Sequence, residues 1–451
     1  MSIFGKVLEI YQEFYLCLHC LGRMFSLLGT DTTNYDRGKS LLLAMTMENH
    51  RVYLSKHENH KDAIVNLKIL AEKAIFTPAQ SVLKKEGIGF NASNASEKCY
   101  LCEGMFNQVS SYAKIALKFL DKLEFKNILV GTALNSQIVN REDSFKAHFS
   151  LLDSESFKNH FNREVGKEIS NLLKIPSEFA NPDITVVYSL DYSSSEIELL
   201  IRSIFIKGKY NKFVRGIPQT HWDCRSCRGK GCELCNFSGK QYKTSVEELI
   251  SPEFLKEANA EDSKFHGAGR EDIDVKMLGE GRPFILELKK PKIRTLNLEK
   301  LQKKVNKKNK NKIKISNLEY SSKLQVKNLK RNAENTRKVY RALTSSYESI
   351  TKEKFEKKLK ELKEVFNKQK VQQRTPHRVS HRRADKIREK KVYHIEGRFV
   401  KPQVFEFIVE AQGGTYIKEI INGDNGRTTP SLTEIFGFSI ECEKLDVLEI
   451  R

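Results

Sequence analysis

The segment Gly269-Arg270-Glu271-Asp272 places an arginine and two carboxylates in one short loop, and Asp274 follows two residues later. A carboxylate beside a guanidinium tends to stay ionised, and a nucleophile or general base needs that charge. The same residues are equally typical of a charged, solvated turn. Their chemistry alone does not rank Glu271, Asp272 and Asp274 as candidates.

Cysteine pairs form a second group of residues with chemical potential. Eight of the nine cysteines fall in Cys-x-x-Cys spacing, which indicates metal–thiolate sites in a reducing cytoplasm rather than disulfides. Four thiolates complete the tetrahedral shell of a structural zinc. The two predicted sets are Cys17, Cys20, Cys99 and Cys102, and Cys224, Cys227, Cys232 and Cys235. For the first set the alternative is four buried free thiols. For the second it is an iron–sulfur cluster or a redox pair.

The elements that must position the acidic loop follow it directly. Apolar residues alternate with polar ones on both sides of the Gly-containing segment Gly279–Arg282, and this pattern predicts a β-hairpin. Its apolar face is formed by Ile273, Val275, Met277, Phe284, Leu286 and Leu288. Alternate strand residues point the same way, so Asp272, Asp274 and Lys276 share the other face.

Other segments show clear periodicity. Phe157–Leu173 and residues 351–367 have the spacing of amphipathic helices. Ser245, with Glu248 three residues later, predicts a capped helix start, and Thr415 predicts a cap for a helix beginning at Tyr416. The predicted strands are Asn127–Leu134, Asp183–Tyr188, Ile197–Ile206 and Val404–Val409.

Composition narrows the class of protein. A chain of 451 residues predicts two or three domains, and the formal net charge of +21 predicts an anionic partner, usually nucleic acid. Part of the lysine excess is also consistent with compositional bias. No apolar run is long enough to cross a membrane. Residues 289–314 hold twelve Lys and Arg against one acid, Glu299, so this stretch is either a solvated insert or a segment that contacts phosphates.

The motif Gly-Arg-Glu-Asp-x-Asp-Val, with Gly-Arg-Pro-Phe after it, resembles the catalytic motif of the Pus-ten family of tRNA pseudouridine synthases. The resemblance implies that Asp272 is the catalytic residue and that Tyr340 is the active-site tyrosine. Gly414-Thr415-Tyr416-Ile417-Lys418 resembles a third motif of related bacterial enzymes, in which the final cation is an arginine that pairs with the catalytic aspartate. The resemblance therefore implies an Asp272–Lys418 pair, with Arg270 as a further cation.

The same resemblance supplies the rest of the expected site and its domains. Tyr416, Ile417 and Leu445 are expected to shape the base pocket. The strand-flanking strings Asn181-Pro182-Asp183 and Gly208-Lys209-Tyr210 resemble the THUMP domain of tRNA-modifying enzymes. The expected domains are residues 1–104 (a zinc-pinned accessory region), 105–215 (THUMP-like), 216–239 (a cysteine-rich loop after the linking segment Val214–Trp222) and 240–451 (catalytic). The implied fold class is α/β plus α+β, with a mixed or antiparallel sheet in the catalytic half.

The implied function is isomerisation of uridine to pseudouridine in the T-loop of tRNA, at positions fifty-four and fifty-five. The implied RNA contacts are the T-arm and the acceptor end, and the chemistry needs no cofactor. Arg374, Arg378, Arg382 and Arg383 form a basic segment expected to contact phosphate. One alternative is a non-catalytic zinc-containing tRNA-binding protein. Another is a different THUMP enzyme, a thiouridine synthase or a methyltransferase, but the chain carries neither a Ser-Gly-Gly loop nor an Asn-Pro-Pro-Tyr motif.

Overall fold

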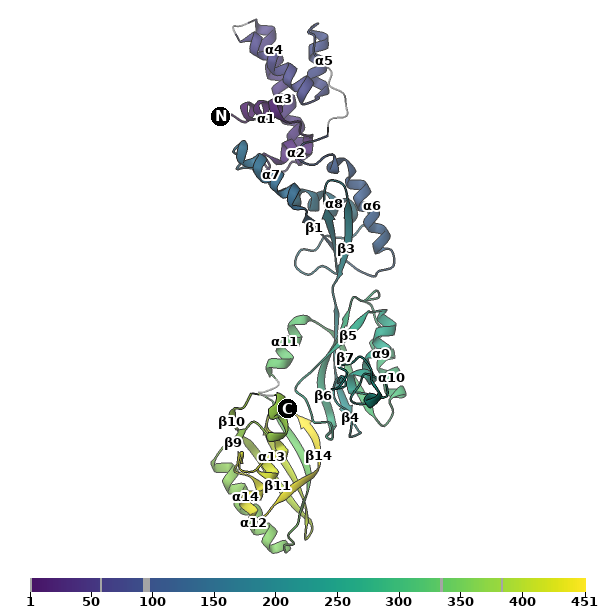
Figure 1. Cartoon of the computed structure of the whole chain (residues 1–451), viewed down its shortest axis with the longest axis vertical. Helices are drawn as coiled ribbons and strands as arrows, with labels where there is room; N and C mark the ends of the chain where they lie inside the picture. The colour runs from purple at the N-terminus through teal and green to yellow at the C-terminus, as the bar shows by residue number, and fades with distance from the viewer. Residues whose placement is uncertain (1, 57–58, 92–97, 333–335, 383) are drawn as a thin grey trace. The chain divides into compact units, whose positions relative to one another are not determined.

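The structure is a computed structural model that describes residues 2–56, 59–91, 98–332, 336–382 and 384–451. Contacts divide the chain into two compact units, residues 1–202 and 203–451, which we call unit 1 and unit 2 (Figure 1). In the part of the chain that is described, no helix combines the length and the apolar character needed to cross a bilayer.

Unit 1 begins with helices and ends with a small sheet. Buried apolar side chains of the helices and of the sheet belong to one continuous core. The helical elements are α1 (Ile3–Glu13), α2 (Leu18–Arg23), α3 (Asn34–Ser55), α4 (His60–Lys68), the π-turn η1 (Ile69–Lys73), α5 (Thr77–Lys85), the 3-10 turn η2 (Met105–Gln108), α6 (Val109–Leu120), α7 (Ser136–His148) and α8 (Phe157–Leu173).

The sheet of unit 1 has the order β1-β2-β3. These strands are β1 (Ile128–Leu134), β2 (Ile184–Leu190) and β3 (Ser195–Ile201). β1 and β2 run parallel, and β3 is antiparallel to β2. Parallel neighbours need a crossover, and α7 and α8 supply it. The predicted helix Phe157–Leu173 is confirmed, and the Ser156 side chain caps it by accepting the Asn159 N–H.

Unit 2 is built on a mixed sheet of eight strands with the order β11-β12-β8-β14-β6-β4-β7, and β5 also pairs with β6. Most pairs are antiparallel, but β14 and β6 run parallel, so the predicted mixed sheet is confirmed. The strands are β4 (Ile204–Lys212), β5 (Asp262–Gly267), β6 (Lys276–Lys289), β7 (Ile313–Ser321), β8 (Arg337–Ser346), β11 (Val392–Lys401), β12 (Val404–Gln412) and β14 (Ile440–Ile450).

A three-stranded sheet, ordered β10-β9-β13, and several helices complete unit 2. The remaining elements are the 3-10 turns η3 (Glu233–Cys235) and η4 (His377–Arg382), helices α9 (Val246–Ala258), α10 (Leu298–Lys308), α11 (Lys323–Asn332), α12 (Lys352–Lys368), α13 (Ile417–Asn422) and α14 (Leu432–Phe436), and strands β9 (Val371–Arg374), β10 (Ile387–Lys390) and β13 (Thr428–Thr429). The predicted cap of α9 is confirmed, because the Ser245 hydroxyl accepts the Glu248 N–H.

The predicted hairpin in residues 273–288 is wrong. Residues 276–289 form one continuous strand, β6, in which Gly279 and Gly281 adopt positive φ. This local kink lets Lys276 and Met277 pair with β14, while residues 282–289 pair with β4 and β5. The predicted apolar alternation is present, but the glycines bend the strand instead of reversing it.

The unit boundary also differs from the expected boundary at residue 215. β4 pairs with β6 and β7, so it belongs to the sheet of unit 2. The predicted strand Ile197–Ile206 is in fact split between β3 and β4, which lie in different units. A run of apolar residues across Arg202 and Ser203 concealed the division.

The lysine-rich segment 289–314 contains one regular helix, α10. Its Leu301 and Val305 are buried in an apolar cluster of unit 2. Lys304 and Lys308 both pair with Glu253 of α9, at 2.6 and 2.9 Å. Part of this basic segment is therefore structural, with lysines that flank an apolar stripe.

Candidate functional site

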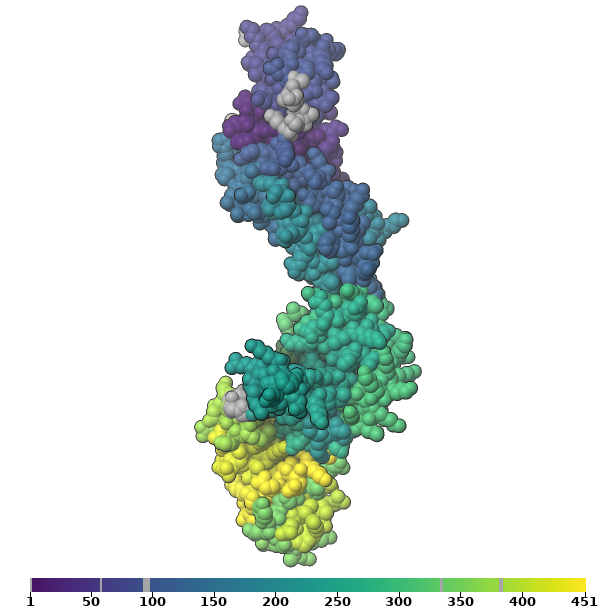
Figure 2. All heavy atoms as spheres, turned by 45° about the vertical axis from the view of Figure 1, so that its right-hand side comes forward, coloured from purple at the N-terminus to yellow at the C-terminus, as the bar shows by residue number. Residues whose placement is uncertain are grey.

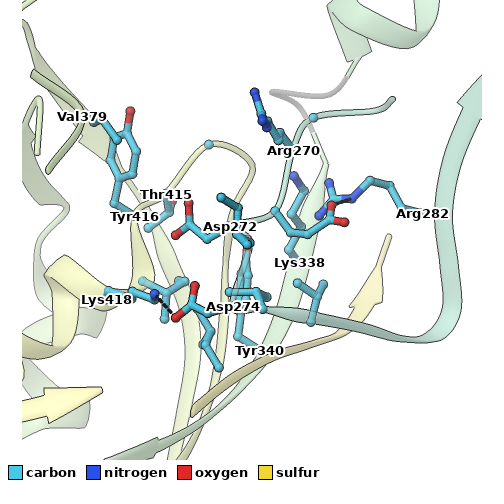
Figure 3. A pocket seen from close by; sticks show the side chains of 18 of the residues that line it. Arg270, Asp272, Asp274, Arg282, Lys338, Tyr340, Val379, Thr415, Tyr416 and Lys418 are labelled. Atoms are coloured by element: carbon cyan, nitrogen blue, oxygen red, sulfur yellow. Dashed lines mark hydrogen bonds and ion pairs between the residues drawn. The ribbon is translucent and has the colours of Figure 1, made fainter. Parts of the chain in front are cut away.

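A cavity of about 580 Å³ opens in unit 2 above the join between β6 and β14. The acidic loop 269–274 enters it, and residues from β8, α13 and β14 form its walls (Figure 3). The predicted site residues that line it are Arg270, Asp272, Tyr340, Tyr416, Ile417, Lys418 and Leu445. The structure thus brings together side chains separated by more than 170 residues of sequence.

Glu271 anchors the loop from below. Its side chain is buried, and the Tyr210 hydroxyl lies 2.8 Å from both of its oxygens. Arg282 Nε lies 2.8 Å from Glu271 Oε2, and Arg282 Nη1 donates to the Ala268 carbonyl. A buried carboxylate is tolerated only when it is paired and hydrogen-bonded in this way. Glu271 is therefore a structural anchor, which distinguishes it from the two aspartates.

Lys212 holds the backbone of the same loop. Its ammonium donates to the carbonyls of Ile217, Asp272 and Ile273 at 3.0–3.3 Å, and its side chain is fully buried. Burial lowers the pKa of Lys212, while the nearby charge of Glu271 opposes that shift. The hydrogen bonds from Lys212 and the ion pair of Glu271 with Arg282 together fix the backbone at Asp272.

The segment Val214–Trp222, expected to be a link between domains, packs against the loop as well. Gln219 donates to the Tyr210 hydroxyl and to the Gly269 carbonyl, and Gly216 N–H donates to the Ile273 carbonyl. A β-carbon at Gly267 would lie 2.7 Å from the Gln219 amide nitrogen. This segment is therefore a supporting wall of the site.

The cation beside Asp272 is Arg378, and the expected Asp272–Lys418 pair is wrong. Arg378 Nη1 lies 3.0 Å from both carboxylate oxygens of Asp272. The same guanidinium also forms an ion pair with buried Glu419 of α13, in which Arg378 Nε lies 2.6 Å from Glu419 Oε1. Arg378 thus fixes Asp272 to the helix that carries Lys418, and it presents the planar fork that a lysine lacks.

Lys418 pairs with Asp274 instead, with Nζ 2.6 Å from Oδ2 (Figure 3). Burial alone would raise the pKa of Asp274, but the Lys418 ammonium lowers it below its usual range. Asp272 and Asp274 are two residues apart and both face the cavity. Each therefore has its own cation, and Lys418 is still a positive charge in the same pocket.

Apolar and aromatic side chains complete the pocket. Tyr340 of β8 is buried against the cavity, and burial raises its pKa to about 12. Ile417 of α13 and Leu445 of β14 are also buried in the wall. The Tyr416 amide and carbonyl are both held by the Gln373 side chain, at 2.9 Å. The apolar side chains of Ile417, Leu445 and Tyr340 give one wall of this charged cavity a surface that a heterocyclic base can contact.

Thr415 does not cap a helix, contrary to the prediction. α13 begins at Ile417 with Tyr416 as N-cap, and the Thr415 hydroxyl donates to the Gln412 carbonyl. Gly414, with φ of +80°, lets the chain turn before the helix. The hydroxyl therefore closes the turn and leaves the helix end uncapped by a side chain.

Arg270 does not lie beside Asp272 as the expected second cation. Its guanidinium sits over the Trp222 ring, 4.7 Å from the centroid. The cavity also has lining residues that the sequence prediction missed, among them Trp222, Arg378, Val379 and Lys338. The sequence predicts Arg378 only as part of a basic segment that contacts phosphate. Within that segment Arg383 lies outside the described residues, as do the side chains of His381 and Arg382.

The two cysteine sets each gather as predicted. In both, the four sulfurs lie within 4.8 Å of one another. The Sγ–Sγ distances of 3.7 Å (Cys17 to Cys102) and 3.9 Å (Cys224 to Cys232) match the tetrahedral edge of about 3.8 Å that Zn–S bonds near 2.3 Å require. The first set belongs to the core of unit 1, whereas the second lies in a surface lobe of unit 2, teal in Figure 2.

Backbone N–H groups also prepare the second set for metal binding. Gly231, Cys232 and Gly239 donate to cysteine sulfurs at 3.2–3.3 Å. Donation from Cys232 and then from Gly239 lowers the pKa of the Cys235 thiol to about 6. Such bonds stabilise thiolates, so the second set fits a thiolate-bound metal.

Comparisons with known proteins agree with this geometry. Residues 205–451 match the model of the Pus10 C-terminal domain, and residues 112–189 match that of the archaeal Pus10 THUMP domain. The curated tRNA pseudouridine synthase Pus10 of Methanocaldococcus jannaschii is 40% identical over 450 residues, covering 98% of this chain and 93% of the relative. The chain belongs to the Pus10 family. This is the Pus-ten family that its motifs resemble.

Further relatives extend the match over nearly the whole chain. The Pus10 protein of Methanopyrus kandleri is 37% identical, with 98% of this chain and 97% of the relative covered. Among solved structures, a Cbf5-Nop10-Gar1 complex aligns at 18% identity over 46% of this chain and 45% of that chain, with a TM-score of 0.27. The Pus10 C-terminal match coincides with unit 2, where the cavity lies.

Proposed function

We propose that this protein is a tRNA pseudouridine synthase with Asp272 as its catalytic carboxylate. The observation that carries the proposal is the position of Asp272 at the cavity, ion-paired to Arg378 and partly exposed, with 32% of its side chain accessible. Glu271 is buried in its own ion pair, and Asp274 is paired to Lys418. Burial excludes Glu271, and the motif resemblance selects Asp272 over Asp274, which also lines the cavity.

The reaction breaks the bond between N1 of uracil and C1′ of ribose, rotates the base and forms a bond from C5 to C1′. A proton leaves C5 and N1 gains one, so no redox change or group transfer occurs. Asp272 acts either by attack on C6 of the base or by removal of the C2′ proton. The target base must leave the RNA stack to reach the pocket. Tyr340 stacks on it or moves a proton, and Tyr416, Ile417 and Leu445 hold the ring.

The substrate class follows from the family and from charge. The relatives are curated as tRNA pseudouridine synthases, and a net charge of +21 favours a polyanion. We assign the T-loop uridines at positions fifty-four and fifty-five as the targets. We expect the THUMP region to grip the acceptor end of the tRNA by shape. The free thiols and metal-type cysteine sets suit a reducing cytoplasm.

Both cysteine sets are assigned as structural zinc sites. The first would join α2 to the segment around Cys99 and Cys102, and the second would shape the lobe at residues 224–235. Neither set lines the cavity, so zinc would supply folding energy and no step of the reaction.

The test is isomerisation of a tRNA transcript by purified protein, scored by pseudouridine-specific chemical mapping. Asp272→Asn should lower turnover at least about 10³-fold while tRNA binding is retained. Asp262→Asn is a matched control, because Asp262 lies on β5 outside the cavity and pairs with Lys289. Turnover by the Asp272 variant at the wild-type rate would exclude this assignment. Modification elsewhere in the tRNA would exclude the T-loop positions alone.

A further inference from the structure

One end of the cavity is lined by cationic side chains that the proposed reaction does not use. Figure 3 shows Lys338, Arg282 and Arg270 on the far side of Asp272 from Lys418 and Asp274. Lys330 of α11 and Trp222 line the same cavity. Glu271 is the carboxylate packed among these cations, and it is already paired to Arg282. Among the described residues at this end, positively charged side chains therefore outnumber negatively charged ones.

Lys338 is a buried lysine at this end of the cavity. It is 5% exposed and lines the cavity, yet its ammonium has no hydrogen-bond or ion-pair partner among the described residues. It lies two residues before Tyr340 on β8, so both side chains face inward. Other buried cations of unit 2 are paired: Arg282 with Glu271, and Lys212 with three carbonyls. An unpaired buried ammonium is costly unless a ligand supplies the missing partner.

The surroundings of Lys338 favour an anion over a neutral group. A β-carbon at Gly269 would lie 3.2 Å from Lys338 Nζ and 3.3 Å from Arg282 Nη1, so two cationic groups converge beneath that glycine. Burial, followed by repulsion from Arg282, lowers the pKa of Lys338 to about 7, so a bound anion would restore its proton. A neutral carbonyl of the base would not balance this charge.

We propose that the Lys338 end of the cavity is a phosphate site, which binds a backbone phosphodiester of the RNA next to the extruded nucleotide. Lys338 supplies the buried ammonium, and Arg270, which stacks on the Trp222 ring, and Lys330 add charge at the rim. The identity of the polymer rests on the proposed function; the affinity for phosphate does not.

The first test uses inorganic phosphate on the full-length protein. Trp222 is the single tryptophan of the chain and stacks with Arg270, so its fluorescence reports on this end of the cavity. At constant ionic strength, phosphate should change the emission in a saturable way. Lys338→Met should weaken the apparent affinity at least about tenfold, the usual effect of losing a charge-assisted bond. Lys360→Met removes the same charge from the exposed face of α12 and should match wild type.

The second test uses a T-arm RNA stem-loop and measures its affinity as a function of salt. Loss of one phosphate contact should reduce the slope of log K against log salt by about 0.7 to 0.9 in Lys338→Met. Asp272→Asn should keep the wild-type slope. An active Asp272 variant would contradict the proposed function and leave this test intact. Wild-type affinity and slope in Lys338→Met would overturn the phosphate site and leave the proposed function standing.

The melting temperature of Lys338→Met provides a third test. Removal of a charge that Arg282 repels should leave the melting temperature of Lys338→Met unchanged or raised. A purely structural lysine would give a lower melting temperature with the RNA slope unchanged, and that result counts against the proposal. If the methionine variant does not fold, Lys338→Gln provides the same two measurements with a polar, uncharged side chain.

Discussion

At the residue scale, the site is defined by which cation each carboxylate meets. Asp272 meets Arg378, Asp274 meets Lys418, and Glu271 meets Arg282. The motif around Lys418 predicted a pair with Asp272, because the related enzymes carry an arginine at that position. Here the guanidinium comes from Arg378 on η4, and the lysine takes the next aspartate. A planar guanidinium therefore still pairs with Asp272, as the motif of the related enzymes implies, but it comes from a different segment of the chain.

Arg378→Met should therefore lower kcat more than Lys418→Met. The first change releases Asp272 and leaves buried Glu419 unpaired, and misplacement of a catalytic group by about 1 Å costs about 100-fold in rate. The second change removes only the partner of Asp274. Single-turnover rates on a T-arm transcript, with melting temperatures measured in parallel, would check this order. If Arg378→Met kept the wild-type rate and Lys418→Met were inactive, the result would favour the Asp272–Lys418 pair that the motif predicts.

The buried amine of Lys338 predicts a pH-dependent stability. Its folded pKa of about 7 lies below the unfolded value of 10.5, and the charged groups that act on it are Arg282, Glu271 and Lys390. Between these two pKa values the unfolded chain binds the extra proton, so wild-type stability rises with pH relative to Lys338→Met. Below pH 7 the difference is constant, with wild type the less stable.

Urea denaturation of both proteins from about pH 6 to about pH 9.5 would measure this difference. The stability of wild type relative to the variant should grow by a few kcal/mol across the window, since one pKa unit corresponds to about 1.4 kcal/mol. A flat difference would mean that Lys338 keeps its proton in the folded protein.

At the element scale, periodicity predicted strands and helices well and predicted pairing poorly. The helix Phe157–Leu173 and the cap at Ser245 depend on local chemistry, which the sequence displays directly. Whether Gly279 and Gly281 reverse β6 or bend it depends on β14, which lies more than 160 residues later. Lys338 and Arg378 lie in β8 and η4, for which no element was predicted, so their positions at the cavity were missed.

Gly279→Ala tests the bend of β6. Gly279 has φ of +59°, and a β-carbon there would lie 1.9 Å from the Leu448 carbonyl of β14. Strain and displacement together should cost at least about 2 kcal/mol, which lowers the melting temperature of unit 2 by about 4 °C or more. Gly216→Ala is the control: φ is +86° there and no atom lies within 4 Å, so strain alone applies, about 1 kcal/mol. Equal effects would show that contact with β14 is not the cause.

At the scale of the whole molecule, the chain consists of two units, each with one cysteine set. Cys20, Cys99 and Cys102 are part of the apolar core of unit 1. The second set lies in a lobe whose Leu234 and Phe237 are largely exposed. A metal in the first set supports a core, whereas a metal in the second shapes a loop. Motif spacing predicted both sets; it could not predict that their surroundings differ.

Elemental analysis of the purified chain should find two zinc ions. Cys20→Ser should remove one and lower the melting transition of unit 1 strongly, because binding energy at a structural zinc is folding energy. Cys227→Ser should remove the other and change the transition of unit 2 much less. Calorimetry would separate the two transitions. Iron in the second site, or unchanged metal content in either variant, would contradict the zinc assignment.

The join between β6 and β14 has a mechanical consequence. Just two residue pairs, Lys276 with Asp446 and Met277 with Val447, are in register there, and the apolar clusters of unit 2 lie on either side of it. The cavity takes its walls from both sides of this narrow seam. We therefore expect an RNA bound in the cavity to contact both sides of this narrow join and to stabilise the pairing of β6 with β14. Slowed amide exchange in β6 and β14 would record that stabilisation.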